Sequence, residues 1–176
     1  PFNSDSQNNN LLQKFSVKAG ITNFSTSLSE LEIHYLISGP INELILPELC
    51  VIKNRANDLW KSTCFELFCS SSKKAEDPYF EMNISPNGDW NFYSLSSYRK
   101  DLAPEPSVAT ISLDARLSED SYLLKAKIPN FPLQSPFYVS LCTILEFKSG
   151  VKSYWALTHS SANADFHNKE SFLLKL

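Results

Sequence analysis

Short runs of β-branched and aromatic residues follow one another along almost the whole chain, separated by turn signals such as Gly39-Pro40 and Pro86-Asn87-Gly88. No long helical periodicity interrupts them. About ten strands at this spacing predict an all-β fold, an antiparallel β-sandwich of two sheets. The expected strands are residues 16–19, 31–38, 64–70, 79–85, 90–95, 109–113, 122–128, 137–146, 153–158 and 171–176.

Two neighbouring expected strands, 64–70 and 79–85, each combine an apolar face with a polar face. Residues two positions apart share a face, because side chains alternate across a strand. The predicted core face consists of Phe65, Leu67, Phe80, Met82 and Ile84. The other face forms a polar stripe of Glu66, Glu81, Asn83 and Ser85, with Trp60 and Trp90 at the strand ends. Polar groups beside aromatic rings on a rigid sheet predict a surface for a small ligand.

Glu66 and Glu81 are expected to lie close together on this stripe, because facing side chains of paired strands have Cβ atoms about 4.5–5.5 Å apart. Two near carboxylates repel, so one takes up a proton or both need a cation, an arginine or a hydroxyl-rich ligand. Arg99 is the candidate partner. The alternative is that both glutamates face solvent on an uncovered sheet.

Size and charge narrow the classes of protein. A chain of 176 residues is the size of one domain, and its net charge of −3 comes without a cluster of basic residues. Nucleic acid and membranes are therefore not expected as partners. We expect a flexible polar tail over residues 1–10 and a single domain over 11–176. No signal-peptide segment is visible, which favours a cytoplasmic location.

Cysteines and histidines give weaker indications of chemistry. Cys50, Cys64, Cys69 and Cys142 lack C-x-x-C spacing and are expected as reduced thiols, with no cofactor and no metal. Near the C-terminus, Trp155 and His159 share a strand face and extend the candidate ligand surface. An alternative use of this region is a metal site built from His159, Asp165 and His167.

Covalent catalysis finds little support in the sequence. The chain has four glycines and neither a Gly-x-Ser-x-Gly elbow nor a phosphate-binding glycine loop. A pair of carboxylates about 5 Å apart would match a retaining glycosidase, but the sequence does not fix that distance.

At these motifs the chain resembles a family of bacterial DOMON-like proteins related to the family 9 carbohydrate-binding modules. The motifs are Asp58-Leu59-Trp60, Thr63-Cys64-Phe65-Glu66, Glu81-x-Asn83-x-Ser85-Pro86-x-Gly88-x-Trp90, Tyr98-Arg99, Tyr154-Trp155-Ala156-Leu157-x-His159 and Asp165-Phe166-His167. The resemblance runs from about Leu11 to Leu176. It implies a jelly-roll-like β-sandwich with a ligand pocket on one face. Ala164 departs from the proline usual before Asp165.

The resemblance also implies how a ligand is held. Sugar-binding relatives clamp the sugar between tryptophans and bond its hydroxyls with charged and amide side chains. Haem is disfavoured, because the parity of Met82 points it to the core. We therefore expect a non-catalytic domain that binds a carbohydrate or similar polyhydroxylated molecule. The candidate ligand-binding residues are Trp60, Glu66, Glu81, Asn83, Trp90, Arg99, Trp155 and His159. The alternatives are an interaction domain with a buried polar network and a carboxylate- or metal-dependent hydrolase.

Overall fold

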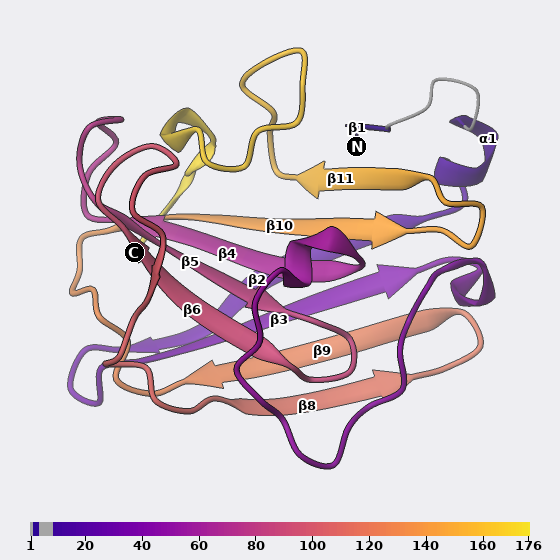
Figure 1. Cartoon of the computed structure of the whole chain (residues 1–176), viewed down its shortest axis with the longest axis horizontal. Helices are drawn as coiled ribbons and strands as arrows, with labels where there is room; N and C mark the ends of the chain where they lie inside the picture. The colour runs from indigo at the N-terminus through magenta and orange to yellow at the C-terminus, as the bar shows by residue number, and fades with distance from the viewer. Residues whose placement is uncertain (1, 4–8) are drawn as a thin grey trace.

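The computed structural model describes residues 2–3 and 9–176. Within these ranges the chain forms an eight-stranded and a four-stranded sheet, and every ladder between their strands is antiparallel (Figure 1). The predicted two-sheet sandwich is therefore confirmed. Most of the predicted tail lies outside the described residues. None of the helices in the described ranges is long and apolar enough to span a membrane.

The sheets are assembled from strands far apart in sequence. The smaller sheet has the order β2 (Ser16–Ser25), β3 (Glu30–Ser38), β9 (Ser121–Ile128) and β8 (Ser112–Leu117). The larger sheet has the order β1 (Phe2–Asn3), β11 (Lys152–Ala156), β10 (Tyr138–Glu146), β4 (Cys64–Ser70), β5 (Tyr79–Ile84), β6 (Trp90–Leu95) and β7 (Ala103–Pro104), and β12 (Leu174–Lys175) also pairs with β10. The short helices are α1 (Asn9–Leu12), η2 (Ile41–Glu43), η3 (Leu59–Lys61) and η4 (Lys169–Ser171).

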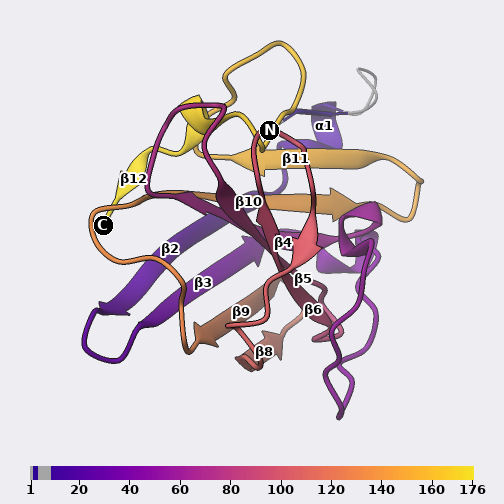
Figure 2. The same cartoon turned by 60° about the vertical axis from the view of Figure 1, so that its left-hand side comes forward.

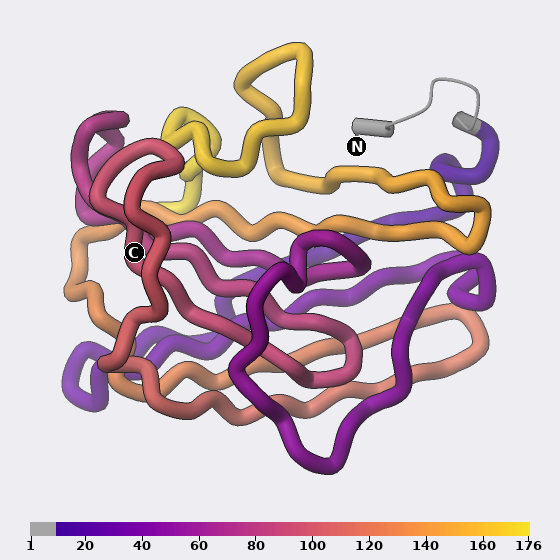
Figure 3. The backbone as a smooth tube through the Cα atoms, in the orientation of Figure 1, coloured from indigo at the N-terminus to yellow at the C-terminus, as the bar shows by residue number. Residues whose placement is uncertain are grey.

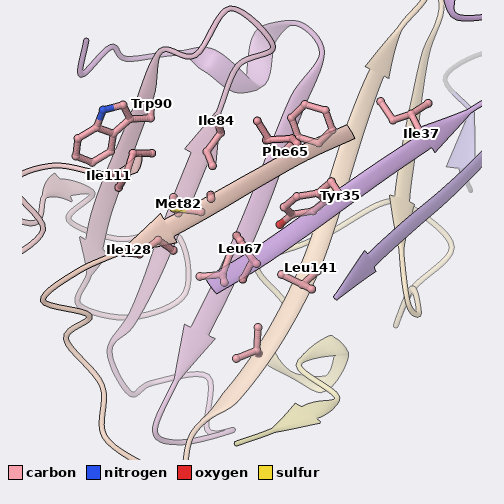
Figure 4. Close-up of a cluster of buried hydrophobic side chains, with 14 of the residues drawn as sticks. Tyr35, Ile37, Phe65, Leu67, Met82, Ile84, Trp90, Ile111, Ile128 and Leu141 are labelled. Carbon is pink, nitrogen blue, oxygen red and sulfur yellow. The ribbon is translucent and has the colours of Figure 1, made fainter. Parts of the chain in front are cut away.

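The core lies between the two sheets and contains the apolar face predicted for β4 and β5 (Figure 4). Phe65 of β4 stacks on Tyr122 of β9 with ring centroids 5.6 Å apart. Tyr35 of β3 lies against the same phenylalanine, and its hydroxyl donates a 2.6 Å hydrogen bond to the main-chain carbonyl of Glu66. This bond joins the two sheets directly beneath the polar stripe.

The two sheets differ in what covers their outer faces. Strands β3 and β9 alternate between buried and more exposed residues, as expected for a sheet with one face toward solvent. In contrast, every residue of β4 is buried, and so is almost all of β5 and β10. The alternative of an uncovered sheet face is therefore wrong for the larger sheet.

A second apolar cluster covers that outer face. Its buried members are Cys64, Phe68, Tyr79, Tyr93, Leu95, Cys142, Ile144, Phe166 and Phe172. The covering segments are η3, the β6–β7 connection (96–102) and the C-terminal segment from 157 to 173 that contains η4. Figures 2 and 3 show the β4–β5 and β6–β7 connections gathered with the η4 region at one end of the sheet.

Strand limits differ from expectation where a partner strand ends. The strand expected at 109–113 is β8 (Ser112–Leu117), because Ser112 pairs near the end of β9 and Pro129 follows that strand. The run expected at 171–176 is a strand only over Leu174–Lys175, since Ser171 ends η4 and residues 172–173 are irregular. Gly88 closes the β5–β6 turn at φ 96°, a left-handed conformation that favours glycine.

Candidate functional site

Glu66 and two residues of β5 form the floor of the site. Glu66 lies directly opposite Asn83, whereas Glu81 lies opposite Phe68, so the two glutamates are diagonal neighbours on one face. The Asn83 amide donates a 2.8 Å hydrogen bond to Glu81 Oε1. The other amide atom, Asn83 Oδ1, is buried without a hydrogen-bond partner.

Above this floor the covering segments leave a cavity of about 300 Å³, which we call the Glu66 cavity. Its lining combines carboxyl, basic and aromatic side chains with a few aliphatic ones. The lining residues are Trp60, Glu66, Phe68, Glu81, Leu95, Arg99, Leu102, Ile144, Tyr154, Ala164, Phe166 and His167.

Aromatic rings from four segments make the walls of the cavity. Phe166 lies between Phe68 of β4, at a centroid distance of 6.3 Å, and Tyr154 of β11, at 6.1 Å. On another side, Trp60 of η3 meets Tyr93 of β6 edge-to-face at 6.1 Å. Trp60 is partly exposed, so one part of its ring remains accessible at the cavity.

Arg99 and Asp165 join the two covering segments. Arg99 Nη2 donates a hydrogen bond to Asp165 Oδ1 at 3.0 Å, and the Tyr98 hydroxyl donates to Asp165 Oδ2 at 2.8 Å. Burial would raise the pKa of Asp165, but these two bonds outweigh it and lower the pKa. The bond to Asp165, together with a 3.3 Å hydrogen bond from Arg99 Nε to the Tyr98 hydroxyl, outweighs the effect of burial on Arg99 and raises its pKa. Both side chains are therefore charged over a wide pH range.

His167 is held against the floor by Tyr79. The Tyr79 hydroxyl lies 2.7 Å from His167 Nδ1 and accepts a 3.1 Å hydrogen bond from the main-chain N–H of Arg99. His167 Nδ1 is also 4.0 Å from Glu81 Oε2. Burial and the nearby Arg99 charge lower the pKa of His167 to about 4. The imidazole is therefore neutral at neutral pH.

Lys169 anchors the C-terminal covering segment. This residue is 4% exposed, and its ammonium donates to the carbonyls of Asp77 at 2.7 Å, Lys74 at 2.8 Å and Pro78 at 3.4 Å. These carbonyls belong to the β4–β5 connection. The contact therefore fixes the segment that carries Phe166 and His167 over the floor.

The floor carboxyl groups are electrostatically unusual. Burial raises the pKa of Glu66 well above its ordinary value, and the nearby Glu81 raises it further. Burial also raises the pKa of Glu81, although the hydrogen bond from Asn83 and the Arg99 charge oppose this. Both carboxyl groups therefore have pKa values above their ordinary range, as in sites where carboxyl groups meet a ligand or carry out chemistry.

Comparison with known proteins identifies the fold. No protein-family model matches the chain, and no curated protein matches it in sequence. Among solved structures, it is similar to a presumed carbohydrate-binding protein from Bacteroides uniformis, with a TM-score of 0.61 and 16% identity over 93% of this chain and 79% of that one. It is also similar to a family 9 carbohydrate-binding module from Caldicellulosiruptor kristjanssonii in complex with cellotriose. There the TM-score is 0.51, with 12% identity over 92% of this chain and 72% of that one. The chain has the fold of a family 9 carbohydrate-binding module.

On this module fold, half of the predicted site residues line one cavity. Trp60, Glu66, Glu81 and Arg99 all border the Glu66 cavity. Asn83 is buried on the same sheet face, opposite Glu66 and hydrogen-bonded to Glu81, and is not among the lining residues. The predicted pairing of Arg99 with the two glutamates is not found. Arg99 directs its hydrogen bonds to Asp165 and Tyr98, so it influences the glutamates only through its charge.

The structure places the other two predicted tryptophans away from the cavity. Trp90 is 4% exposed in the core between the sheets, where Arg55 lies over its ring at 4.7 Å. Trp155 pairs with Thr143 and packs against the same core. Its indole N–H donates to Ser153 Oγ at 2.8 Å. Both rings point to the core side because of their parity on β6 and β11.

The predicted histidine and metal ligands have other contacts. His159 stacks on Phe166 with centroids 6.1 Å apart, behind the wall of the cavity. The Asp165 carboxylate accepts hydrogen bonds from Arg99 and Tyr98, and the His167 ring is hydrogen-bonded to the Tyr79 hydroxyl. Among the residues that the structure describes, no group of three or more His, Cys, Asp or Glu side chains is placed to hold a metal ion.

Sequence reasoning missed Phe68, Tyr154 and Phe166 as walls of the cavity. Tyr154 is adjacent to the predicted Trp155 but lies on the opposite face of β11, across from Ile144. Parity was an available signal for Phe68 alone, which shares a face of β4 with Glu66. Phe166 lies outside the strands, and Tyr154 needed the pairing of the strands. The β10–β4 register places Cys142 opposite Glu66, which puts Ile144 and Tyr154 on the cavity side.

Proposed function

We propose that this protein is a non-catalytic binding domain for a small polyhydroxylated molecule, most simply one sugar residue at the end of a saccharide. The observation that carries the proposal is the Glu66 cavity, whose floor is polar and whose walls are aromatic. Rings stack on the apolar faces of a sugar, while the carboxyl groups accept hydrogen bonds from its hydroxyls.

The size of the cavity supports a small ligand. Its volume of about 300 Å³ is at the lower end of the range for small-molecule pockets. The fold shared with carbohydrate-binding modules supports the same ligand class, since one solved relative is in complex with cellotriose. A cavity of this size suits one sugar ring, with any further rings lying outside.

The placement of the carboxyl groups favours binding over hydrolysis. A glycosidase needs two carboxyl groups that flank the scissile bond. Glu66 and Glu81 instead rise from neighbouring strands on the same face of one sheet, beneath the cavity. The open cavity beside Glu66 also argues against a purely structural network, because such a network would be closed to solvent.

Thermal shift and calorimetry with a panel of monosaccharides and oligosaccharides test the proposal. A sugar at 100 times its Kd stabilises the folded state by about 2.7 kcal/mol, which raises Tm by roughly 5–11 °C for a chain of this length. Trp60→Ala should abolish the shift. Trp155→Ala is the matched control, because that ring faces the opposite side of the sheet. Absence of any shift across the panel, or equal losses in both variants, would overturn the proposal.

A further inference from the structure

The floor of the Glu66 cavity is rich in hydrogen-bond acceptors. Glu66 and Glu81 are 3% and 4% exposed, and both line the cavity. Asn83 is 0% exposed on the same face, spends its amide N–H on Glu81 and leaves Oδ1 without a partner. A buried acceptor without a donor is costly, because it has lost its bonds to water. The floor is therefore complementary to a group that brings N–H or O–H donors.

The charges around the floor also favour a ligand that brings positive charge. Among the lining residues that the structure describes, Arg99 is the one side chain that is cationic at neutral pH, and its guanidinium is paired with Asp165. His167 is neutral there, because its pKa is about 4. The two floor carboxyl groups thus have no cation dedicated to them within the lining.

The walls add a third feature that points to positive charge. Trp60, Phe68, Tyr154 and Phe166 all border the cavity, and the last three form a continuous set of ring contacts. A cation near the face of an aromatic ring is attracted by the ring quadrupole, more strongly when water is excluded. Aromatic walls above a carboxyl floor are therefore suited to an organic cation.

We propose that the ligand of the Glu66 cavity carries a protonated amino group, which lies on Glu66 and Glu81 between the aromatic walls. This inference rests on the proposed function and narrows it. The ligand class becomes a small amino sugar with a free amine, instead of a neutral sugar or an N-acetylated one.

The acceptor floor distinguishes between kinds of cation. A quaternary ammonium would satisfy the aromatic walls but has no N–H group to donate. A primary ammonium brings three donors, enough for both carboxyl groups that line the cavity. The sugar hydroxyls would then lie nearer the rim, where Trp60 and Arg99 are located.

Binding of an ammonium should release a proton. The titratable groups that face Glu66 are Cys64 and Glu81 on the adjoining positions, Cys142 on β10, Tyr35 on β3, and Arg99 and His167 on the covering segments. Burial raises the pKa of both thiols and of Tyr35, so these groups stay neutral. The proton therefore leaves the glutamates, whose ionised forms a bound cation favours.

The test compares three forms of each hexose by isothermal titration calorimetry at pH 6.5. Glucosamine, galactosamine and mannosamine are each titrated beside the parent hexose and the N-acetyl derivative. Each titration is repeated in two buffers of different ionisation enthalpy. At least one amino sugar should bind tenfold or more tightly than its two neutral counterparts, with a buffer-dependent enthalpy that reports proton release. Choline serves as the quaternary probe and should bind more weakly than that amino sugar.

Glu66→Gln should remove the preference for the amine and the proton release while leaving the fold intact. Glu48→Gln, at an exposed position, should change neither. Equal or tighter binding of the neutral hexose would overturn this inference and leave the proposed function standing. Tighter binding of choline, or an amine preference that persists in Glu66→Gln, would also overturn it. If none of these sugars bound, this inference would fall, while the proposed function would still be decided by the wider panel of oligosaccharides.

Discussion

Arg99 and Asp165 form an ion pair at 3.0 Å across 66 positions of the chain. The pair joins the β6–β7 connection to the C-terminal segment above the Glu66 cavity. The ion pair therefore connects two loops that both contribute lining residues to the cavity.

Removing this ion pair should change stability little. Arg99 is largely exposed and Asp165 partly so, and exposed pairs contribute about 0–1 kcal/mol. A double-mutant cycle of Arg99→Gln and Asp165→Asn, followed by urea denaturation, should give a coupling energy below about 1 kcal/mol. The coupling should shrink as salt is added. A coupling of several kcal/mol would show that the pair supports the fold itself.

Glu66→Gln should stabilise the protein at neutral pH. Burial raises the pKa of Glu66, so the unfolded state binds fewer protons than the folded one above the ordinary carboxyl pKa. Folding stability is therefore lost as pH rises from about 4.3 toward the raised pKa. The amide has no ionisable group, so the stability gain of the variant over the wild type should grow as pH rises. Urea denaturation at pH 5 and pH 7.5 measures it. Glu48→Gln, at an exposed position, is the control and should change stability by less than about 0.5 kcal/mol. Destabilisation by Glu66→Gln at pH 7.5 would contradict the assignment.

His167 should give stability the opposite dependence on pH. Its folded pKa is about 4, below the unfolded value of about 6.5, so the unfolded state binds more protons between these limits. Stability present above pH 6.5 is lost as pH falls toward 4, by up to about 3 kcal/mol. His167→Gln should flatten this acid slope in a denaturation series. If the substitution left the acid loss of stability unchanged, a group other than His167 would be responsible for it.

Lys169→Met should be strongly destabilising. The substitution leaves three carbonyls of the β4–β5 connection without their buried donor. Each unsatisfied group costs about 1–3 kcal/mol, and partial access of water reduces the total, so we expect a loss of about 2–4 kcal/mol. Lys100→Met, at an exposed position, should change stability by less than about 0.5 kcal/mol. Similar losses in the two variants would show that the carbonyl contacts are dispensable.

The tryptophans should separate binding from folding. Trp90→Ala removes a core ring and should cost about 3–5 kcal/mol. Trp60→Ala should cost less, because that ring is partly exposed on η3, yet it should remove ligand binding. Chemical denaturation and calorimetry on both variants compare the two effects. The reverse pattern would contradict the placement of the rings.

Local patterns predicted the strands and faces, because alternation is a property of neighbouring residues. The limits of β4 and β6 are as expected, and Met82 lies in the core. Glu66 and Glu81 were recognisable as a site because polar residues occur where apolar ones would continue the pattern. Their diagonal placement needed the pairing register, which single-strand parity does not contain.

The cover of the site depends on contacts distant in sequence. Nothing local in Lys169 indicates that it binds carbonyls more than 90 positions away. Likewise, the pairing of Arg99 with Asp165 follows from how two loops meet. The sequence predicts Trp155 as part of the ligand surface from the resemblance and from the face it shares with His159, and neither places its strand relative to β4. The pairing register places its neighbour Tyr154 on the cavity side, and Trp155 therefore lies on the core side.

The bond from the Tyr35 hydroxyl has a consequence for altering specificity. It ends on the main-chain carbonyl of position 66 and makes no use of the side chain there. A residue at 66 that keeps the extended backbone of β4 keeps this connection between the sheets. The chain can thus exchange the group that meets the ligand while the scaffold beneath it is preserved, which makes position 66 the natural starting point for redirecting the domain to a different molecule.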